Sequence, residues 1–160
     1  MADETESTTP QDVDEEHLAY AAFDEEEAWQ LGSLLRRWAV ERGHGVAIDV
    51  RRPSGLILFR AALPGATADQ EHWIRRKAAV VFRFERSSAG VVARLEGVDV
   101  AAAGWFDPRE YALAGGSVPV RVRGAGVVAA VTVSGLSSEE DHALVVEALR
   151  ERIGSSSRPA

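Results

Sequence analysis

The short β-rich runs of this chain come in neighbouring pairs that stand between helical segments, and this order limits the folds available to it. The turns inside the pairs carry Pro53 and Gly55 in one case and Gly124-Ala125-Gly126 in the other, as is typical of tight turns between antiparallel strands. Five runs are expected as strands: residues 45–50, 56–62, 111–113, 118–123 and 127–134. Hairpins that alternate with helices predict an α+β domain in which helices flank one antiparallel sheet.

Three long helices are expected around these strands. Apolar residues recur at helical spacing over about residues 24–42, 68–86 and 138–153. Asp24 is the expected N-cap of the first helix, and Ser137 with Glu140 has the spacing of a capping box before the last one. Gly43 and Gly154 are the expected stops of these two helices.

Both ends of the chain are expected to lie outside the folded part. Residues 1–27 contain 11 of the 25 acidic residues and no Lys or Arg, and the first 22 residues hold few apolar side chains. Such a segment cannot offset the entropy of ordering it. We therefore predict a disordered acidic arm over residues 1–22, a single domain over residues 23–153 and a disordered tail over residues 154–160.

Composition excludes several kinds of site. The chain has no cysteine, so disulfides, thiolate nucleophiles and iron–sulfur clusters are impossible. No two histidines have the i, i+4 spacing of a zinc helix, and no G-x-S-x-G elbow is present, so neither a metal site nor a hydrolase is expected. No apolar run approaches the roughly 20 residues that cross a bilayer. We therefore expect a cytoplasmic protein that does not insert into membranes. Because the basic residues beyond residue 27 only slightly outnumber the acidic ones, it is not expected to bind nucleic acid.

Residues 124–129 also fit the degenerate G-x-G-x-x-A pattern of a dinucleotide-binding loop. That loop functions only where its glycines join a strand to the N-terminus of a helix. Here both flanks are β-rich, so we interpret the segment as a hairpin turn. Pro119, just upstream, has no N–H to donate, which predicts that its strand lies at a sheet edge or begins late.

Two polar side chains are predicted to lie on the apolar faces of helices. On a helical wheel of residues 68–86, Lys77 falls near the middle of the apolar arc, while arginines form the opposite face. A lysine in this position either pairs with a carboxylate or is kept for a shifted pKa, and pairing is the commoner case. His142 heads the apolar stripe of the last helix, where it serves either as a packing residue or as a haem or metal ligand.

Two sequence strings carry a resemblance to a known family. They are Asp69-Gln70-Glu71-His72-Trp73-Ile74-Arg75-Arg76-Lys77 and residues 124–136, the second followed by Glu140-Asp141-His142. Through them, residues 24–150 resemble the GlcG/HbpS-like group of the haem-degrading-domain superfamily. The resemblance implies a profilin-like α+β layer domain with a five-stranded antiparallel sheet, and a tendency to form homo-oligomers. Some members bind haem, and a eukaryotic relative is linked to the delivery of tail-anchored proteins.

The resemblance also implies a set of candidate ligand-binding residues, in a pocket or an interface. The matching positions are Trp73, Arg75, Lys77, Ser88, Asp141 and His142. The chain departs from the family pattern at Gln70, where the family has Asn, and at Glu85, where it has the Gly of a turn before Ser87-Ser88.

The sequence thus favours a non-catalytic, oligomeric module that binds a small ligand, with haem or an organic anion as the candidate. The alternative is an oligomeric protein-interaction module, associated with chaperones or tail-anchored delivery. A haem-degrading enzyme ranks third, because no residue set specifies oxygen activation. If the ligand is haem, its axial ligand is expected to be a histidine or one of Tyr20 and Tyr111. Among the histidines, His142 lies at the edge of an apolar stripe. The arginine face of residues 68–86 could then bind the haem propionates.

Overall fold

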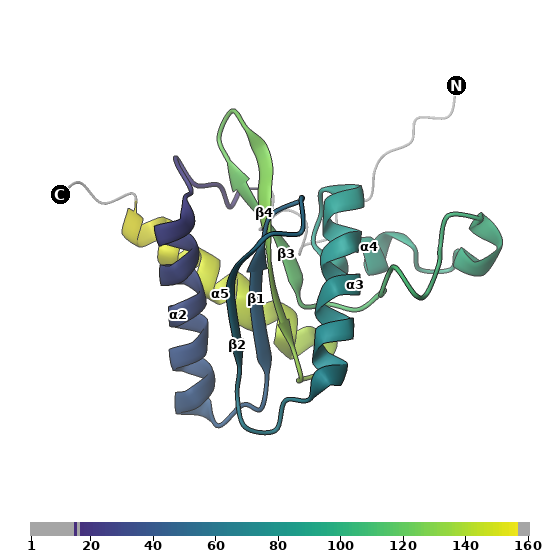
Figure 1. Ribbon diagram of the computed structural model, residues 1–160. Helices are drawn as coiled ribbons and strands as arrows, with labels where there is room; N and C mark the ends of the chain where they lie inside the picture. The colour runs from purple at the N-terminus through teal and green to yellow at the C-terminus, as the bar shows by residue number, and fades with distance from the viewer. Residues whose placement is uncertain (1–14, 16, 157–160) are drawn as a thin grey trace.

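The computed structural model describes residue 15 and residues 17–156, so the predictions for residues 1–14, 16 and 157–160 lie outside it. Within the described chain, helices and strands follow one another in the order helix, hairpin, helix, hairpin, helix, with two short helical segments in the middle (Figure 1). The elements are α2 (Glu25–Arg42), β1 (Ala47–Arg51), β2 (Ile57–Ala62), α3 (Ala68–Phe84), α4 (Ser88–Arg94), the 3-10 helix η1 (Val100–Ala103), β3 (Ser117–Val122), β4 (Gly126–Ser134) and α5 (Ser138–Ser156).

The sheet is antiparallel, but it has four strands in the order β2-β1-β4-β3, so the prediction of five is wrong. Residues 111–113 form no strand because tertiary contacts hold them elsewhere. The Ala112 N–H donates to the Arg76 carbonyl, and the Tyr111 ring packs against Trp105. The prediction for Pro119 is confirmed, since it lies on the edge strand β3.

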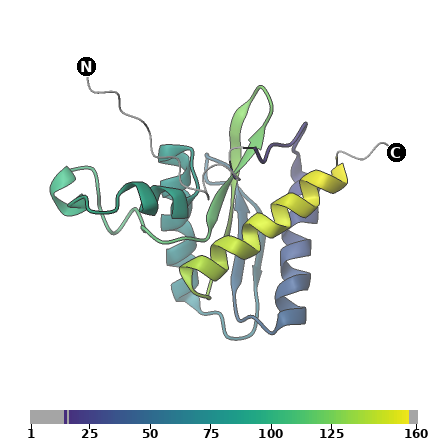
Figure 2. The ribbon, with the colours of Figure 1, turned by 180° about the vertical axis from the view of Figure 1, so that it is seen from behind.

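Helices cover both faces of the sheet (Figures 1 and 2). α2 and α5 pack together on one face, over the main hydrophobic core, and α3 with α4 lies against the other. Alternation along the strands makes the two faces different. Ile48 and Val50 point into the main core, whereas Asp49 and Thr132 are fully buried polar residues on the α3 side. The sheet face under α3 can therefore hold buried polar groups.

The predicted helix caps are mostly confirmed. The Asp24 side chain accepts from the Glu27 N–H, and Gly43 ends α2 with a left-handed φ of 69°. Ser137 and Glu140 form the two hydrogen bonds of a capping box at the start of α5. Gly154 does not stop this helix, which continues to Ser156, so the predicted boundary of the tail at residue 154 is wrong.

The segment from residue 17 to residue 22 packs on the domain, in contrast to the predicted disorder up to residue 22. Tyr20 is 1% exposed and belongs to the main core. Its N–H donates to the Arg121 carbonyl, its own carbonyl accepts from the Arg123 N–H, and it forms a parallel bridge with Val122. The composition of the arm is polar, but one tyrosine is enough to anchor this part of it on β3.

Gly124-Ala125-Gly126 joins β3 directly to β4, which confirms the hairpin interpretation. Gly124 and Gly126 both have positive φ, at 81° and 78°, as tight turns between strands require.

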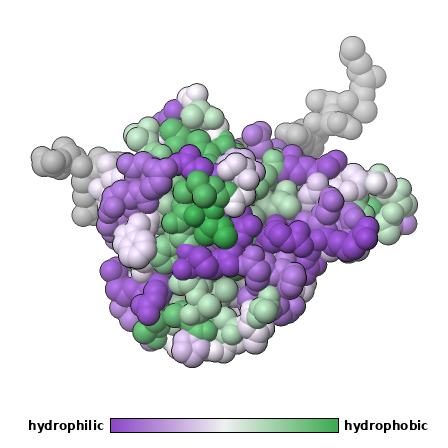
Figure 3. All heavy atoms as spheres, viewed as in Figure 1, coloured by the Kyte–Doolittle hydropathy of each residue, from purple (hydrophilic) through white to green (hydrophobic). Residues whose placement is uncertain are grey.

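Exposed apolar side chains gather at the open edge of β2. Trp29 on α2 is 58% exposed, and Leu56 and Ile57 at the start of β2 are 59% and 44% exposed. Figure 3 shows a hydrophobic patch in the middle of one molecular face, bordered by hydrophilic residues. Among the described residues, no helix is long and apolar enough to cross a membrane, and no cluster of three potential metal ligands occurs.

Candidate functional site

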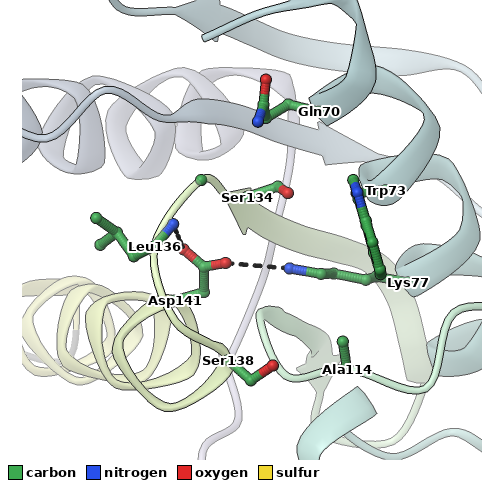
Figure 4. Close-up of a pocket in the computed structure, with 9 residues that line it drawn as sticks. Gln70, Trp73, Lys77, Ala114, Ser134, Leu136, Ser138 and Asp141 are labelled. Atoms are coloured by element: carbon green, nitrogen blue, oxygen red, sulfur yellow. Dashed lines mark hydrogen bonds and ion pairs between the residues drawn. The ribbon is translucent and has the colours of Figure 1, made fainter. Parts of the chain in front are cut away.

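A buried ion pair joins α3 to the first turn of α5. The Lys77 Nζ lies 3.1 Å from the Asp141 Oδ2, and the two side chains are 3% and 2% exposed (Figure 4). The prediction that Lys77 points inward and pairs with a carboxylate is therefore confirmed. The structure also brings together two of the candidate residues that lie 64 positions apart in the chain.

Further hydrogen bonds fix both partners. The Lys77 Nζ also donates to the Val133 carbonyl, and the Asp141 Oδ1 accepts from the Leu136 N–H. Burial lowers the pKa of Lys77 and raises the pKa of Asp141, and in each case the charge of the partner opposes this effect. Removing one partner of such a buried ion pair is costly, because the charge of the other partner stays buried.

Gly116 brings the backbone close to this pair. Its φ is 128°, and a Cβ built there would lie 2.5 Å from the Val133 carbonyl oxygen and 2.7 Å from the Lys77 Nζ. These distances leave no room for a side chain. The Gly115-Gly116 break before β3 is thus needed for the ion pair to form beside the strand.

A cavity of about 240 Å³ opens beside the ion pair. Trp73 forms one wall, with its indole N–H donating to Asp69. In Figure 4, residues from α3, from the end of β4 and from the start of α5 surround the opening. The described residues that line this cavity, which we call the Lys77 cavity, are Gln70, Trp73, Lys77, Ala114, Ser134, Gly135, Leu136, Ser138 and Asp141.

His142 lines a second, larger cavity of about 410 Å³, which we call the His142 cavity. Its imidazole is 12% exposed, and its Nε2 lies 2.8 Å from a carboxylate oxygen of Glu15. The other ring nitrogen, Nδ1, is buried and has no hydrogen-bond partner in the part of the chain that the structure describes. The lining residues are Ala89, Val92, Ala93, Leu113, Ala114, Gly115, Ser138, Glu139, His142 and Ala143. The two cavities share Ala114 and Ser138.

Two predicted site residues lie outside both cavities. The Arg75 guanidinium donates to the Arg109 carbonyl, on the exposed side of α3. The Ser88 hydroxyl is buried and exchanges hydrogen bonds with the backbone of Ser117, so it fixes the start of β3. Arg83, also on the predicted arginine face, stacks over Trp105 and Tyr111. Arg75 and Arg83 therefore hold residues 105–111 against α3, and no arginine is among the described residues that line the His142 cavity.

Sequence reasoning missed Gln70, Ser134 and Glu15 as neighbours of the site. Gln70 is the N3 residue of a capping box with Thr67, and its side chain also reaches the Lys77 cavity. The departure from the family's Asn at this position was the available signal. Ser134 lies within the second string that carries the resemblance, residues 124–136, which was the signal for it. Glu15 had none, because it lies outside both strings and far from His142 in sequence.

Glu85 keeps the turn for which the family uses glycine. It is the only described non-glycine residue with a positive φ, at 52°, and it ends α3. A residue with a side chain costs about 1–2 kcal/mol in this conformation. The turn before Ser87-Ser88 is therefore retained at a cost in stability.

Comparisons with known proteins agree with this architecture. The family model described as "Haem degrading protein HbpS-like" matches residues 23–150. A UPF0303 protein of Acidobacterium capsulatum is 49% identical over 137 residues, which cover 84% of this chain and 82% of the relative.

Two solved structures show the same fold. The crystal structure of Ybr137w has a TM-score of 0.87 at 30% identity and covers 92% of this chain and 88% of that one. A complex of PduOC with haem has a TM-score of 0.68 at 15% identity and covers 81% of this chain and 94% of that one. At this identity the likeness shows the fold alone. Because the family match spans residues 23–150 and the relative is similar over 82% of its length, this chain belongs to the HbpS-like family of haem-degrading-domain proteins.

Proposed function

We propose that this chain is a non-catalytic small-ligand-binding module whose ligand is haem, held in the His142 cavity. The observation that carries the proposal is an apolar cavity of about 410 Å³, within the range of about 300–1,000 Å³ for small-molecule sites, with one imidazole on its wall. Membership of the HbpS-like family and the haem complex of the structural neighbour PduOC support the choice of ligand.

The residues fit haem on two counts. Val92, Leu113 and the alanines around them would hold the apolar body of the porphyrin, and His142 would hold its iron. The Nε2 of His142 faces Glu15, so coordination through this nitrogen requires Glu15 to give way. Haem, when bound, supplies redox chemistry, and the chain itself supplies the binding cavity and the imidazole.

A haem titration tests this proposal. Addition of haem is expected to shift the Soret band in a saturable way, and His142→Ala is expected to raise the Kd at least about tenfold, because the axial ligand is lost. Glu15→Ala, which releases Nε2, is expected to lower the Kd. His72→Ala removes an exposed histidine of α3 and serves as the matched control, with unchanged binding. The absence of a saturable shift, or equal binding by the His142→Ala and His72→Ala variants, would contradict the proposal.

The open edge of β2 favours a second function, self-association. β2 pairs only with β1 in the described sheet, so its outer backbone groups have no strand partner there. An edge strand beside exposed Leu56, Ile57 and Trp29 is a typical template for another strand. We propose that a second copy of the chain covers this edge about a two-fold axis, since the same patch can then satisfy both copies.

Light scattering tests self-association. The protein is expected to have a mass of at least twice the 17.2 kDa of one chain at micromolar concentration. Leu56→Asp combined with Ile57→Lys is expected to reduce this mass towards that of a monomer, because charges replace the apolar patch. Val40→Asp, at another exposed apolar position on α2, is the control. A monomeric native protein, or equal effects of both changes, would refute this interface.

A further inference from the structure

The Lys77 cavity has the features of a binding site in its own right, separate from the His142 cavity. We propose that it binds a small organic carboxylate, which accepts hydrogen bonds from Lys77, Gln70 and Ser134 and lies against Trp73. The proposal does not rest on haem binding, because His142 lines only the other cavity.

Lys77 has one hydrogen-bond donor to spare. An ammonium group has three N–H donors, and Asp141 and the Val133 carbonyl take two of them. The Nζ lies at the wall of the cavity, on a side chain that is 3% exposed. A buried ammonium with an unused donor is a strong partner for a charged acceptor, since water screens it little.

Gln70 presents its amide nitrogen to the cavity. Its Oε1 accepts from the backbone N–H of Thr67, 2.6 Å away, in the capping box of α3. This hydrogen bond fixes which end of the amide is oxygen, so the NH₂ group must point the other way. Figure 4 shows that nitrogen on the cavity side of the residue.

Ser134 contributes a hydroxyl at the wall of the cavity. It lies at the end of β4 on the α3 side of the sheet, and the residue is 4% exposed. In Figure 4 the hydroxyl points into the opening between Gln70 and Lys77. A hydroxyl that faces the cavity can donate a hydrogen bond to an oxygen of a bound ligand.

These groups select a ligand that accepts hydrogen bonds. Asp141 is the one acid among the described lining residues, and both of its oxygens are already engaged, by Lys77 and by the Leu136 N–H. The positive end of the α5 dipole lies at the same wall, where Ser138 begins the helix. The volume of about 240 Å³ is below that of drug-sized sites, and the indole of Trp73 offers a flat apolar surface. A small carboxylate with a short apolar body fits all of these features.

The single lysine of the chain makes a direct experiment possible. Protein labelled with ¹⁵N at the lysine Nζ gives one ammonium signal, that of Lys77. Acetate, lactate and benzoate are titrated separately to about 20 mM, since so small a ligand is expected to bind with a Kd near 1 mM. At least one of the three is expected to shift the signal in a saturable way, and acetamide and benzamide, which lack the charge, are expected to bind at least about tenfold more weakly.

Variants then locate the site. Ser134→Ala is expected to weaken binding of the responding acid about three- to tenfold, because one hydrogen bond to the carboxylate is lost. Arg75→Met removes a cation from the outer side of the same helix and is expected to leave the Kd unchanged. His142→Ala is also expected to leave it unchanged, which separates this proposal from the haem site. No saturable shift with any of the three acids, or equal effects of Ser134→Ala and Arg75→Met, would overturn the proposal.

Discussion

Asp141→Ala is expected to lower the free energy of unfolding by about 3–5 kcal/mol, because it leaves the Lys77 ammonium buried without its carboxylate partner. The Leu136 N–H at the start of α5 also loses its acceptor. For a domain of this size, such a loss corresponds to a decrease in melting temperature of roughly 10 °C or more. Urea denaturation and thermal unfolding, followed by circular dichroism, measure both quantities.

Lys77→Met is expected to cost clearly less than Asp141→Ala. The methionine fills a similar volume, and the remaining Asp141 keeps its hydrogen bond from Leu136. Glu147→Ala breaks the solvent-exposed pair with Arg42 and serves as a control with little effect on melting temperature. Equal and small effects of Asp141→Ala and Lys77→Met would show that the pair contributes nothing to stability.

The loss of unfolding free energy caused by Lys77→Met is also expected to depend on pH. Burial already holds the pKa of Asp141 above its usual 3.8, and removal of the cation that opposes this shift raises the pKa further. The folded state then binds more protons than the unfolded state, so its stability increases as the pH falls towards the raised pKa. The difference in unfolding free energy between variant and native protein should therefore be smaller at pH 5 than at pH 7. A larger difference at pH 5 would contradict a raised pKa of Asp141 in the variant.

Tyr20→Ala is expected to destabilise the domain by about 3–5 kcal/mol, the usual cost of truncating a large aromatic residue in a core. Tyr20 is 1% exposed, and its ring meets Phe23 edge-on at 5.3 Å between centroids. Tyr20→Phe keeps the ring and the backbone bridge to β3, so it is expected to retain most of the stability. Chemical denaturation of both variants provides the measurement. A Tyr20→Ala variant as stable as the native protein would mean that residues 17–22 do not contribute to the core.

Helices and hairpins are predictable from this sequence because their signals are local. Asp24, Gly43 and the Ser137–Glu140 capping box mark helix ends, and Gly124-Ala125-Gly126 marks a turn, each within a few residues. Residues 111–113 have the composition of a strand, but contacts with α3 and with Trp105 determine their conformation. The burial of Tyr20 depends on β3, about a hundred residues away, and an average over the composition of the arm cannot detect it.

The same distinction applies to the candidate site. Helical periodicity predicts that Lys77 points inward, and this is confirmed, but the identity of its partner depends on how α5 meets α3. The resemblance to a family places Arg75 and Ser88 with the site, yet both serve the scaffold through contacts with Arg109 and with β3. A pattern of matching residues does not separate those that line a cavity from those that support it.

The burial of Lys77 has a consequence for the chemical reactivity of the protein. Lys77 is the only lysine in the sequence, and its ammonium lies inside the junction of α3 and α5. Enzymes that acetylate or ubiquitinate lysine are too large to enter the Lys77 cavity, so they can reach this side chain only when the junction opens. The rate at which an acetyltransferase modifies Lys77 therefore reports how often these two helices separate in the native protein.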